Sequence, residues 1–244
     1  MASTSTARPT EMDAAQKMDQ QYRYQRYVYD LSRKYYLLGR DTILTEMPIK
    51  PGDTVLEIGC GTARNLLRLA YRHPYAGLYG VDASAVMLET ARDKVNSTLY
   101  ADRITLKQGL AGQIRPADFG LDKPFDHILF SYVLSMIPGW KTALEKTLGI
   151  LKPGGCLHIV DFSDQQTMPG WFRKLLLQWL EWFHVHPDPE VPAFLENLAA
   201  REHDQLRMRQ LPGRYALLAH YQKQGGTPND HEPEFPQVPH HLDF

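Results

Sequence analysis

A glycine-containing turn is the first feature of this sequence that could take part in chemistry. It lies in residues 55–65, VLEIGCGTARN, a pattern typical of an apolar strand, a tight turn and the start of a helix. Glycines let the backbone approach a ligand closely at the carboxyl end of such a strand. A dinucleotide-binding fingerprint requires glycine or alanine where Arg64 stands, so the pattern disfavours a dehydrogenase.

Two acidic residues near this turn indicate which ligand it suits. Glu57 stands two residues before Gly59, where a carboxylate would repel a pyrophosphate and attract an ammonium group. Asp82 ends the next apolar run, 21 residues after Gly61, and a carboxylate there can accept hydrogen bonds from both hydroxyls of a ribose. Together these residues predict a ligand that combines a nucleoside with an amino acid.

These segments resemble the cofactor loops of class I S-adenosylmethionine-dependent methyltransferases, with YGVDAS at residues 79–84 as the second acidic strand. The resemblance covers about Asp53 to Lys223. It implies S-adenosylmethionine as cofactor, S-adenosylhomocysteine as product and no metal. The residues that it assigns to cofactor binding are Tyr36, Arg40, Glu57, Gly59, Cys60, Gly61, Asn65, Asp82, Ala83, Met87, Gln108, Gly109, Leu110, Ser131, Tyr132 and Met136.

Two departures from that family's patterns bear on the ligands. Leu110 stands where many relatives carry an acid, so adenine N6 would depend on the backbone or on Gln108. Ser131 and Tyr132 stand where DNA and protein-glutamine methyltransferases show Asn/Asp-Pro-Pro-Tyr, which argues against those substrates.

A non-catalytic protein that keeps the fold to bind a lipid or a partner is the alternative from a different functional class.

The segment before the first strand is rich in tyrosine and arginine. In a helix, Tyr22, Tyr29 and Tyr36 would share one stripe, and Arg26 would begin a neighbouring stripe of arginines. Tyrosine faces attract alkylated ammonium groups, and arginines pair with carboxylates, so the segment fits a zwitterionic substrate. The alternative is that the tyrosines pack on the sheet while the arginines face solvent.

This segment, YRYQRYVYDLSRKYYLLGRD at residues 22–41, resembles the diacylglyceryl-homoserine N-methyltransferases of betaine-lipid synthesis. The segments around Asp161, Trp171 and Trp182 are similar to that family too. The resemblance implies three N-methylations of a lipid-linked homoserine amine. Substrate contacts are then expected at Tyr22, Arg26, Tyr29 and Trp171, and the candidate proton acceptors are Tyr27, Tyr132 and His184.

The element Gly39-Arg40 also occurs in quinone-biosynthesis C-methyltransferases, which are the alternative enzyme class. A C-methyltransferase would place one methyl group on a ring carbon, whereas the homoserine enzymes would methylate one nitrogen three times. The two classes therefore differ in the atom that accepts the methyl group.

The predicted helix at residues 168–183 is unusually apolar. Apolar residues from Phe172 to Phe183 recur at helical spacing and form one face, while Trp171, Leu177 and Trp182 fall outside it. Tryptophan favours the interface between a membrane and water, so this helix either docks on lipid or is covered by a neighbour. His184 and His186 form an i, i+2 pair without a third ligand, which disfavours metal binding.

The order of apolar runs predicts a doubly wound, Rossmann-like α/β fold. Expected strands cover 54–58, 77–81, 104–108, 125–132 and 156–162, and a turn at 152–155 precedes the last of them. Expected helices cover 63–71, 85–95, 139–151 and 168–183. A final antiparallel pair of strands covers 205–210 and 214–222. We therefore expect a seven-stranded sheet with an antiparallel last strand, an N-terminal helical cap and a helical insertion after strand five.

The expected boundaries are a disordered tail at 1–12, a single domain at 13–222 and an extended tail at 223–244. Within the domain, the cap covers 13–50 and the core covers 53–222.

Composition limits the partners and the location. The 244 residues carry 27 Lys and Arg against 28 Asp and Glu, a net charge of -1 that gives no long-range attraction to nucleic acid. Two cysteines and a polar amino terminus predict a cytoplasmic protein. The expected partners are a lipid at the inner face of the membrane and, as a candidate, the enzyme that makes diacylglyceryl-homoserine.

Overall fold

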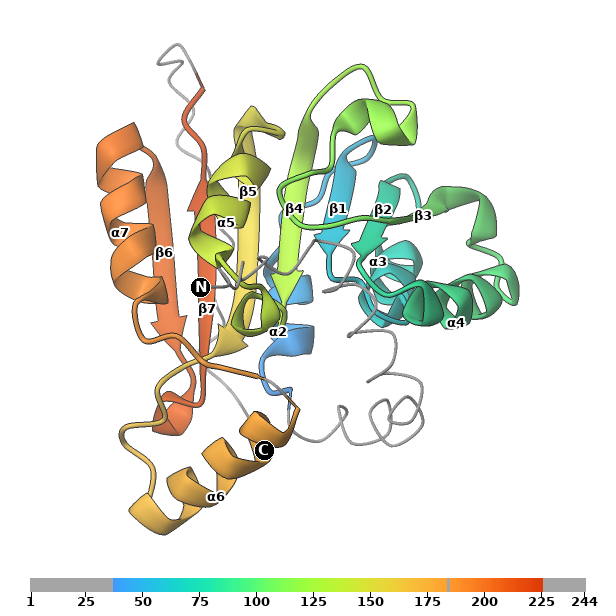
Figure 1. Cartoon of the computed structure of the whole chain (residues 1–244). Coiled ribbons are helices and arrows are strands. Elements are labelled where there is room, and N and C mark those ends of the chain that lie inside the picture. Colours follow the sequence, from blue (N-terminus) through green and yellow to red (C-terminus); the bar gives the residue numbers. More distant parts are fainter. Residues whose placement is uncertain (1–36, 184, 226–244) are drawn as a thin grey trace, which may run out of the picture.

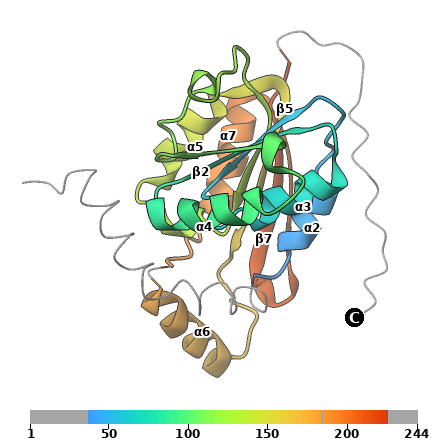
Figure 2. The same ribbon diagram turned by 90° about the vertical axis from the view of Figure 1, so that its right-hand side faces the viewer.

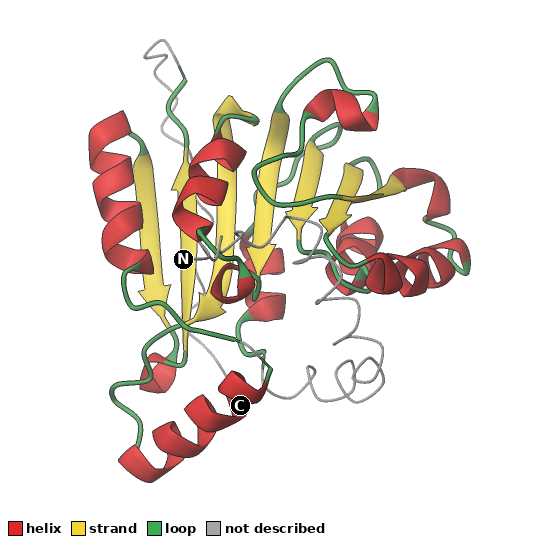
Figure 3. Ribbon diagram, viewed as in Figure 1, coloured by secondary structure: helices red, strands yellow, loops and turns green. Residues whose placement is uncertain are grey.

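The computed structural model describes residues 37–183 and 185–225, and every structural statement below concerns these residues. A seven-stranded sheet with helices on both faces forms the body of the molecule (Figures 1 and 3). The strands are β1 Thr54–Ile58, β2 Gly77–Asp82, β3 Ile104–Gln108, β4 Phe125–Ser131, β5 Leu151–Phe162, β6 Gln205–Gln210 and β7 Ala216–Gln222. The α-helices are α2 Arg40–Glu46, α3 Arg64–Arg72, α4 Ala85–Asn96, α5 Trp140–Leu148, α6 Gly170–Trp182 and α7 Val191–Glu202.

The strand order is β3-β2-β1-β4-β5-β7-β6. Neighbouring strands from β3 to β5 pair in parallel, whereas β7 pairs antiparallel with both β5 and β6. The fold prediction of a doubly wound sheet with an antiparallel last strand is therefore confirmed. Because the parallel strands run the same way, their carboxyl ends share one edge of the sheet, and α6 lies at that end of the molecule (Figure 1).

Two apolar cores lie on opposite faces of the sheet. Alternate residues of a strand face opposite sides, so Val55 and Leu129 join one core while Leu56 and Ile128 join the other. The first core also contains side chains of α2, α3, α4 and α6, and the second contains those of α5 and α7. Figure 2 shows α5 and α7 on one side of the sheet and α2 and α3 on the other.

The structure differs from the sequence expectations at strand β5. The turn expected at residues 152–155 is part of the strand, which begins at Leu151. Gly154 N donates to Lys223 O and Lys223 N donates to Gly155 O, so the chain after β7 continues the hydrogen-bonded ladder through these glycines. Against β4, however, the pairing passes from Phe125–Leu151 directly to His127–Cys156, so residues 152–155 bulge out of the β4–β5 ladder, and Gly154 has a positive φ of 79°.

Helix α7 was not anticipated, although Val191, Leu195 and Leu198 have helical spacing and pack into the second core. The expected orientation of α6 was wrong in part. Leu177 packs against the first core, whereas Phe172 and Leu175 are exposed. The helix buries a narrower face than its sequence suggested because it contacts the body along one side only.

Candidate cofactor-binding site

The glycine turn after β1 is held against β2 by its backbone. Gly59 N and Cys60 N both donate to Val81 O, at 2.7 and 2.9 Å. Gly59 has φ of 70°, and a Cβ atom there would lie 2.3 Å from Cγ2 of Val133. Both the left-handed backbone and the close approach of Val133 therefore require glycine at this position.

Asp82 connects this turn to the second half of the site. Its side chain is buried, with Oδ2 accepting from Gly61 N at 2.7 Å and Oδ1 accepting from Ser84 N at 2.9 Å. Ser84 in turn caps α4, since its Oγ accepts from Met87 N. One carboxylate thus fixes the spacing between the glycine turn and the amino terminus of α4.

Glu57 and Asn65 form a second buried polar contact. Glu57 Oε1 accepts from Asn65 Nδ2 at 2.6 Å, and both side chains are almost completely buried. This contact ties the first turn of α3 to β1. The assignment of Glu57 to the ammonium group of the cofactor stays a prediction.

A cavity of about 420 Å³ opens at the carboxyl ends of β1, β2 and β4. This size falls within the usual range for a small-molecule site. The predicted cofactor residues that line it are Gly59, Gly61, Asp82, Ala83, Met87, Gly109, Leu110, Tyr132 and Met136. Those that are described but do not line it are Arg40, Glu57, Cys60, Asn65, Gln108 and Ser131.

The predicted residues outside the cavity wall have other contacts. Cys60 is buried, and its Sγ occupies the space beside Gly80. Burial, together with the nearby charges of Asp82 and Glu57, raises the pKa of the Cys60 thiol well above its ordinary value. Gln108 Nε2 donates to Ala83 O at 3.0 Å, so it supports the loop that lines the cavity.

Tyr132 has a structural contact that its assignment as a proton acceptor did not anticipate. Its φ is 56°, its ring lies 4.7 Å from that of Phe162, and its hydroxyl donates to Leu38 O. The hydroxyl therefore attaches the segment before α2 to the end of β4. To act as a proton acceptor, the hydroxyl would first have to lose the proton that makes this hydrogen bond.

The other predicted substrate and catalytic residues are not brought to the cavity by the described structure. Tyr22, Arg26, Tyr27, Tyr29, Tyr36 and His184 lie outside the described residues. Trp171 lies in the first turn of α6, does not line the cavity and is 73% exposed. Arg40 is half-buried at the first position of α2.

Most of the cavity wall that follows β4 was not predicted. Besides the predicted Met136, it is formed by residues of the loop after β4 and of α5: Val133, Ile137, Pro138, Gly139, Thr142, Ala143 and Lys146. The turn at Leu134–Met136 is held by Asp161, which accepts from Ser135 N at 3.2 Å and from Ser135 Oγ at 2.8 Å. Burial raises the pKa of Asp161 despite these hydrogen bonds. The only sequence signal for the role of Asp161 in holding this turn is its place as an acid near the end of a predicted strand.

Comparison with known proteins agrees with this fold and loop. Residues 56–157 match the model of a family described as a methyltransferase domain. A 2-phytyl-1,4-naphtoquinone methyltransferase of Trichormus variabilis is 33% identical over 156 residues, 59% of this chain and 66% of that protein. A demethylmenaquinone methyltransferase of Symbiobacterium thermophilum is 32% identical over 142 residues, 56% of this chain and 55% of that protein.

The chain thus spans less than two thirds of the length of these relatives. Among solved structures, a SAM-dependent methyltransferase from Aquifex aeolicus superposes with a TM-score of 0.58 at 20% identity, over 88% of this chain and 99% of that one. Residues 56–157, which include the glycine turn, are therefore similar in sequence to a methyltransferase domain, and the fold is one that solved methyltransferases share.

Proposed function

We propose that this chain, which contains a class I S-adenosylmethionine-dependent methyltransferase domain, transfers the sulfonium methyl group to an acceptor that carries an apolar tail. The observation that supports methyl transfer is the cavity at the carboxyl ends of β1, β2 and β4, whose wall combines a glycine turn with the Asp82 carboxylate. S-adenosylmethionine supplies an electrophilic methyl group, so the protein needs no covalent step of its own.

The chain's residues would then hold and shield the reacting groups. The backbone of Gly59 and Gly61 lets the ligand approach closely, and Asp82 offers carboxylate oxygens to ribose hydroxyls. Met87, Leu110 and Met136 give the cavity an apolar wall, which excludes water. Orientation and desolvation are the main sources of rate for such an in-line transfer.

The comparisons favour a quinone ring carbon as acceptor, because both relatives are named as quinone methyltransferases. Their names specify naphthoquinone-type molecules, of which the 2-phytyl compound carries a long apolar chain. However, the matched family segment, residues 56–157, includes much of the cofactor cavity and excludes α6 and everything before β1. The likeness therefore bears more directly on the cofactor than on the acceptor.

The homoserine amine of diacylglyceryl-homoserine is the second candidate acceptor, with three successive methylations. It rests on the resemblance of residues 22–41 to the betaine-lipid enzymes, of which only 37–41 are described. Neither relative compared above is named as an enzyme of that kind. Both acceptors share one property, a polar reacting head on a lipid-soluble tail.

A lipid-soluble tail on the acceptor agrees with the position of α6. This helix projects beyond the sheet at the carboxyl ends of the parallel strands (Figure 1) and exposes Trp171, Leu175 and Trp182. None of the described helices is long and apolar enough to cross a membrane. We propose that the protein binds peripherally at the inner face of a membrane, with the exposed side of α6 against the lipid.

One assay tests the reaction and distinguishes the acceptors. The full chain is incubated with methyl-labelled S-adenosylmethionine and detergent-dispersed diacylglyceryl-homoserine or a demethylated naphthoquinone, and the products are analysed by mass spectrometry. Label on nitrogen in one to three steps supports the homoserine acceptor, and label on a ring carbon supports the quinone. Binding of S-adenosylhomocysteine without turnover of either lipid would support a non-catalytic binding protein instead.

A further inference from the structure

Three histidines form a row across the sheet at the end opposite the cofactor cavity. His127 on β4, His158 on β5 and His220 on β7 are all buried. His158 pairs with His220 in the register of β5 and β7, and His127 lies four residues before the carboxyl end of β4. At about 3.3 Å per residue, the row lies roughly 13 Å from the cavity end of the strand.

The row makes four polar contacts in succession. His127 Nε2 lies 3.1 Å from Asp53 Oδ2, and His127 Nδ1 lies 3.2 Å from His158 Nε2. His158 Nδ1 lies 2.8 Å from His220 Nδ1, and His220 Nε2 lies 3.1 Å from Glu46 Oε2. Every nitrogen of the three rings is used.

These four contacts need four hydrogens, but three neutral imidazoles carry only three. Burial lowers the pKa of His127 and of His158, which disfavours a fourth proton on either ring. Burial alone would raise the pKa of Glu46, but the hydrogen bond to His220 and the charge of Arg209 lower it overall. With three neutral rings, one contact in the row joins two lone pairs.

The distances indicate which contact lacks the hydrogen. The two end rings donate to the carboxylates, so His158 has one proton for its two neighbours. The His158–His220 separation, 2.8 Å, is that of a good hydrogen bond, and the His127–His158 separation, 3.2 Å, is longer. With the proton toward His220, His127 Nδ1 and His158 Nε2 face one another as two acceptors.

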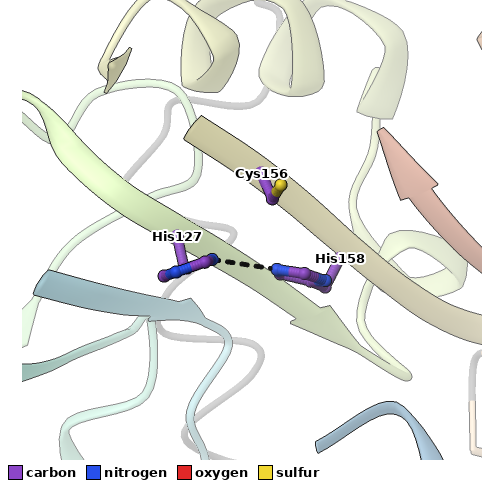
Figure 4. Close-up of side chains that lie close together, drawn as sticks. All are labelled: His127, Cys156 and His158. Atoms are coloured by element: carbon purple, nitrogen blue, oxygen red, sulfur yellow. Dashed lines mark hydrogen bonds between the residues drawn. The ribbon is translucent and has the colours of Figure 1, made fainter. Parts of the chain in front are cut away.

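Cys156 supplies a third donor atom at this point. It pairs with His127 in the register of β4 and β5, and it lies on the same face of β5 as His158 (Figure 4). The ligand atoms of His127, Cys156 and His158 all lie within 4.8 Å of one another, and the three residues are buried. We propose that His127, Cys156 and His158 form a binding site for a borderline-soft divalent metal ion, with Zn²⁺ as the best match.

The donor set agrees with that ion. Zinc prefers imidazole nitrogen and cysteine sulfur, and two nitrogens at about 2.0 to 2.1 Å from a tetrahedral zinc lie about 3.3 Å apart. Asp53 and His220 contact the ring nitrogens that would not bind the metal, as outer partners that orient metal-binding imidazoles commonly do. Three protein donors leave the fourth position to water.

Metal binding would exchange one proton for the ion. Burial raises the pKa of the Cys156 thiol to about 11, so in the absence of the ion the thiol carries its hydrogen. Binding breaks the S–H bond, forms a metal–sulfur bond and releases the proton to solvent. The site would link β4 to β5 and stabilise the folded state.

The experiment uses Co²⁺ as a spectroscopic probe of the full chain. Protein treated with a chelator is titrated with Co²⁺ both in the folded state and during refolding from denaturant, so that access to a buried site does not limit binding. One equivalent should bind with a sulfur-to-cobalt charge-transfer band and the visible bands of a tetrahedral site. Zn²⁺ should then displace the cobalt.

The two cysteines provide a matched pair of variants, since the chain contains only Cys60 and Cys156. Cys60→Ala should keep the charge-transfer band, and Cys156→Ala should lose it. His220→Gln, which changes an outer partner only, should weaken Co²⁺ binding by about 10- to 100-fold. Circular dichroism checks that each variant is folded.

Absence of the charge-transfer band from the parent protein under both protocols would overturn the proposal. So would persistence of the band in Cys156→Ala, or cobalt bound by nitrogen and oxygen alone. If Cys156→Ala fails to fold, X-ray absorption of the cobalt-loaded parent protein decides. One sulfur with two imidazoles supports the site, and any coordination without sulfur refutes it.

Discussion

Among single residues, Asp82 combines a structural role with a place in the cavity wall, and the two roles are compatible. Its carboxylate holds the glycine turn through Gly61 N and the start of α4 through Ser84 N, and it also lines the cavity. Hydrogen bonds to a charged group are stronger than those between neutral groups. The residue that would bind the ribose is thus already oriented by the backbone around it.

We expect Asp82→Ala to weaken S-adenosylhomocysteine binding by about 1 to 3 kcal/mol, because charge-assisted hydrogen bonds are lost. Isothermal titration calorimetry on folded protein measures the effect. Asp102→Ala, at an exposed position beside β3, is the matched control and should bind as the parent does. Equal affinity of the parent and Asp82→Ala would remove Asp82 from the ribose site.

A comparison of Gly59 with Gly120 separates the effect of a positive φ from the effect of the space available for a side chain. Gly59→Ala should abolish measurable S-adenosylhomocysteine binding or greatly weaken it, because the new methyl group would meet Val133 at 2.3 Å and shift the turn. Gly120 also has positive φ, 73°, but no atom lies within 4 Å of an added Cβ. Gly120→Ala should therefore cost only about 1 to 2 kcal/mol of stability and leave binding intact.

Binding by calorimetry and unfolding in urea report the two effects independently. If Gly59→Ala lost stability but bound the ligand normally, the close contact with Val133 would be unimportant for the site.

At the scale of secondary-structure elements, α2 is attached to α3 by an ion pair. Asp41 contacts Arg64 at 2.9 Å and Arg68 at 3.2 Å. Burial alone would raise the pKa of Asp41, but the hydrogen bond and charge of Arg64, with the charges of Arg68 and Arg40, lower it overall. The pair is partly exposed, so its contribution to stability is small.

We expect Asp41→Asn to lower the free energy of unfolding at pH 7 by about 0.2 to 1 kcal/mol. Because the folded pKa lies below the unfolded one, this stabilisation is present above about pH 4 and disappears as the pH falls through the folded value. Urea unfolding between pH 3 and 7 measures the difference, with Asp93→Asn on exposed α4 surface as control. A deficit that did not shrink at low pH would argue against the ion pair.

Helix α6 presents one exposed apolar stripe. Trp171, Leu175 and Trp182 lie within about 40° of one another around an ideal helix, and each is at least 60% exposed. Leu176 and Leu180 on the other side pack into the core. The helix can therefore contact a lipid surface without unpacking from the body.

Replacing Trp171, Leu175 and Trp182 with Ser should abolish co-sedimentation with liposomes, because apolar insertion is the main source of binding for a nearly neutral protein. A double variant at the exposed Tyr71 and Leu99, which lie outside α6, serves as control and should pellet as the parent does. Vesicle binding by the α6 variant equal to that of the parent would leave α6 with a structural role only.

At the scale of the whole molecule, the cofactor cavity and the histidine row lie toward opposite ends of the parallel strands. The cofactor cavity lies at the carboxyl ends of the parallel strands, and the histidine row lies near their other ends. A ligand that binds only the folded protein stabilises it, by about 2.7 kcal/mol at a concentration 100 times its dissociation constant.

Saturating S-adenosylhomocysteine should therefore raise the midpoint of thermal unfolding by roughly 5 to 11 °C, given about 2 to 4 °C per kcal/mol for a protein of this size. Differential scanning calorimetry measures the shift, with adenine alone as the ligand control. No shift at a concentration that saturates calorimetric binding would indicate that the ligand also binds the unfolded chain.

The parts of this protein that depend on neighbours along the chain could be predicted from the sequence. The glycine turn, Asp82 at a strand end and the alternation of strands and helices are local patterns, and the structure places them as expected. The start of β5 and helix α7 differ from the expectations. The residues of the expected turn, 152–155, bulge from the pairing with β4, but hydrogen bonds of Gly154 and Gly155 with Lys223, far away in the sequence, join them to the sheet.

Which distant residues meet depends on the folded structure. No spacing in the sequence relates His127, Cys156 and His158 to His220, because pairing between strands depends on register and on the insertion of β7 beside β5. The same reason applies to the cavity wall after β4 and to the hydroxyl of Tyr132, which contacts Leu38 some 94 residues earlier. Such contacts form when the sheet assembles, since packing and register bring together side chains that no local pattern connects.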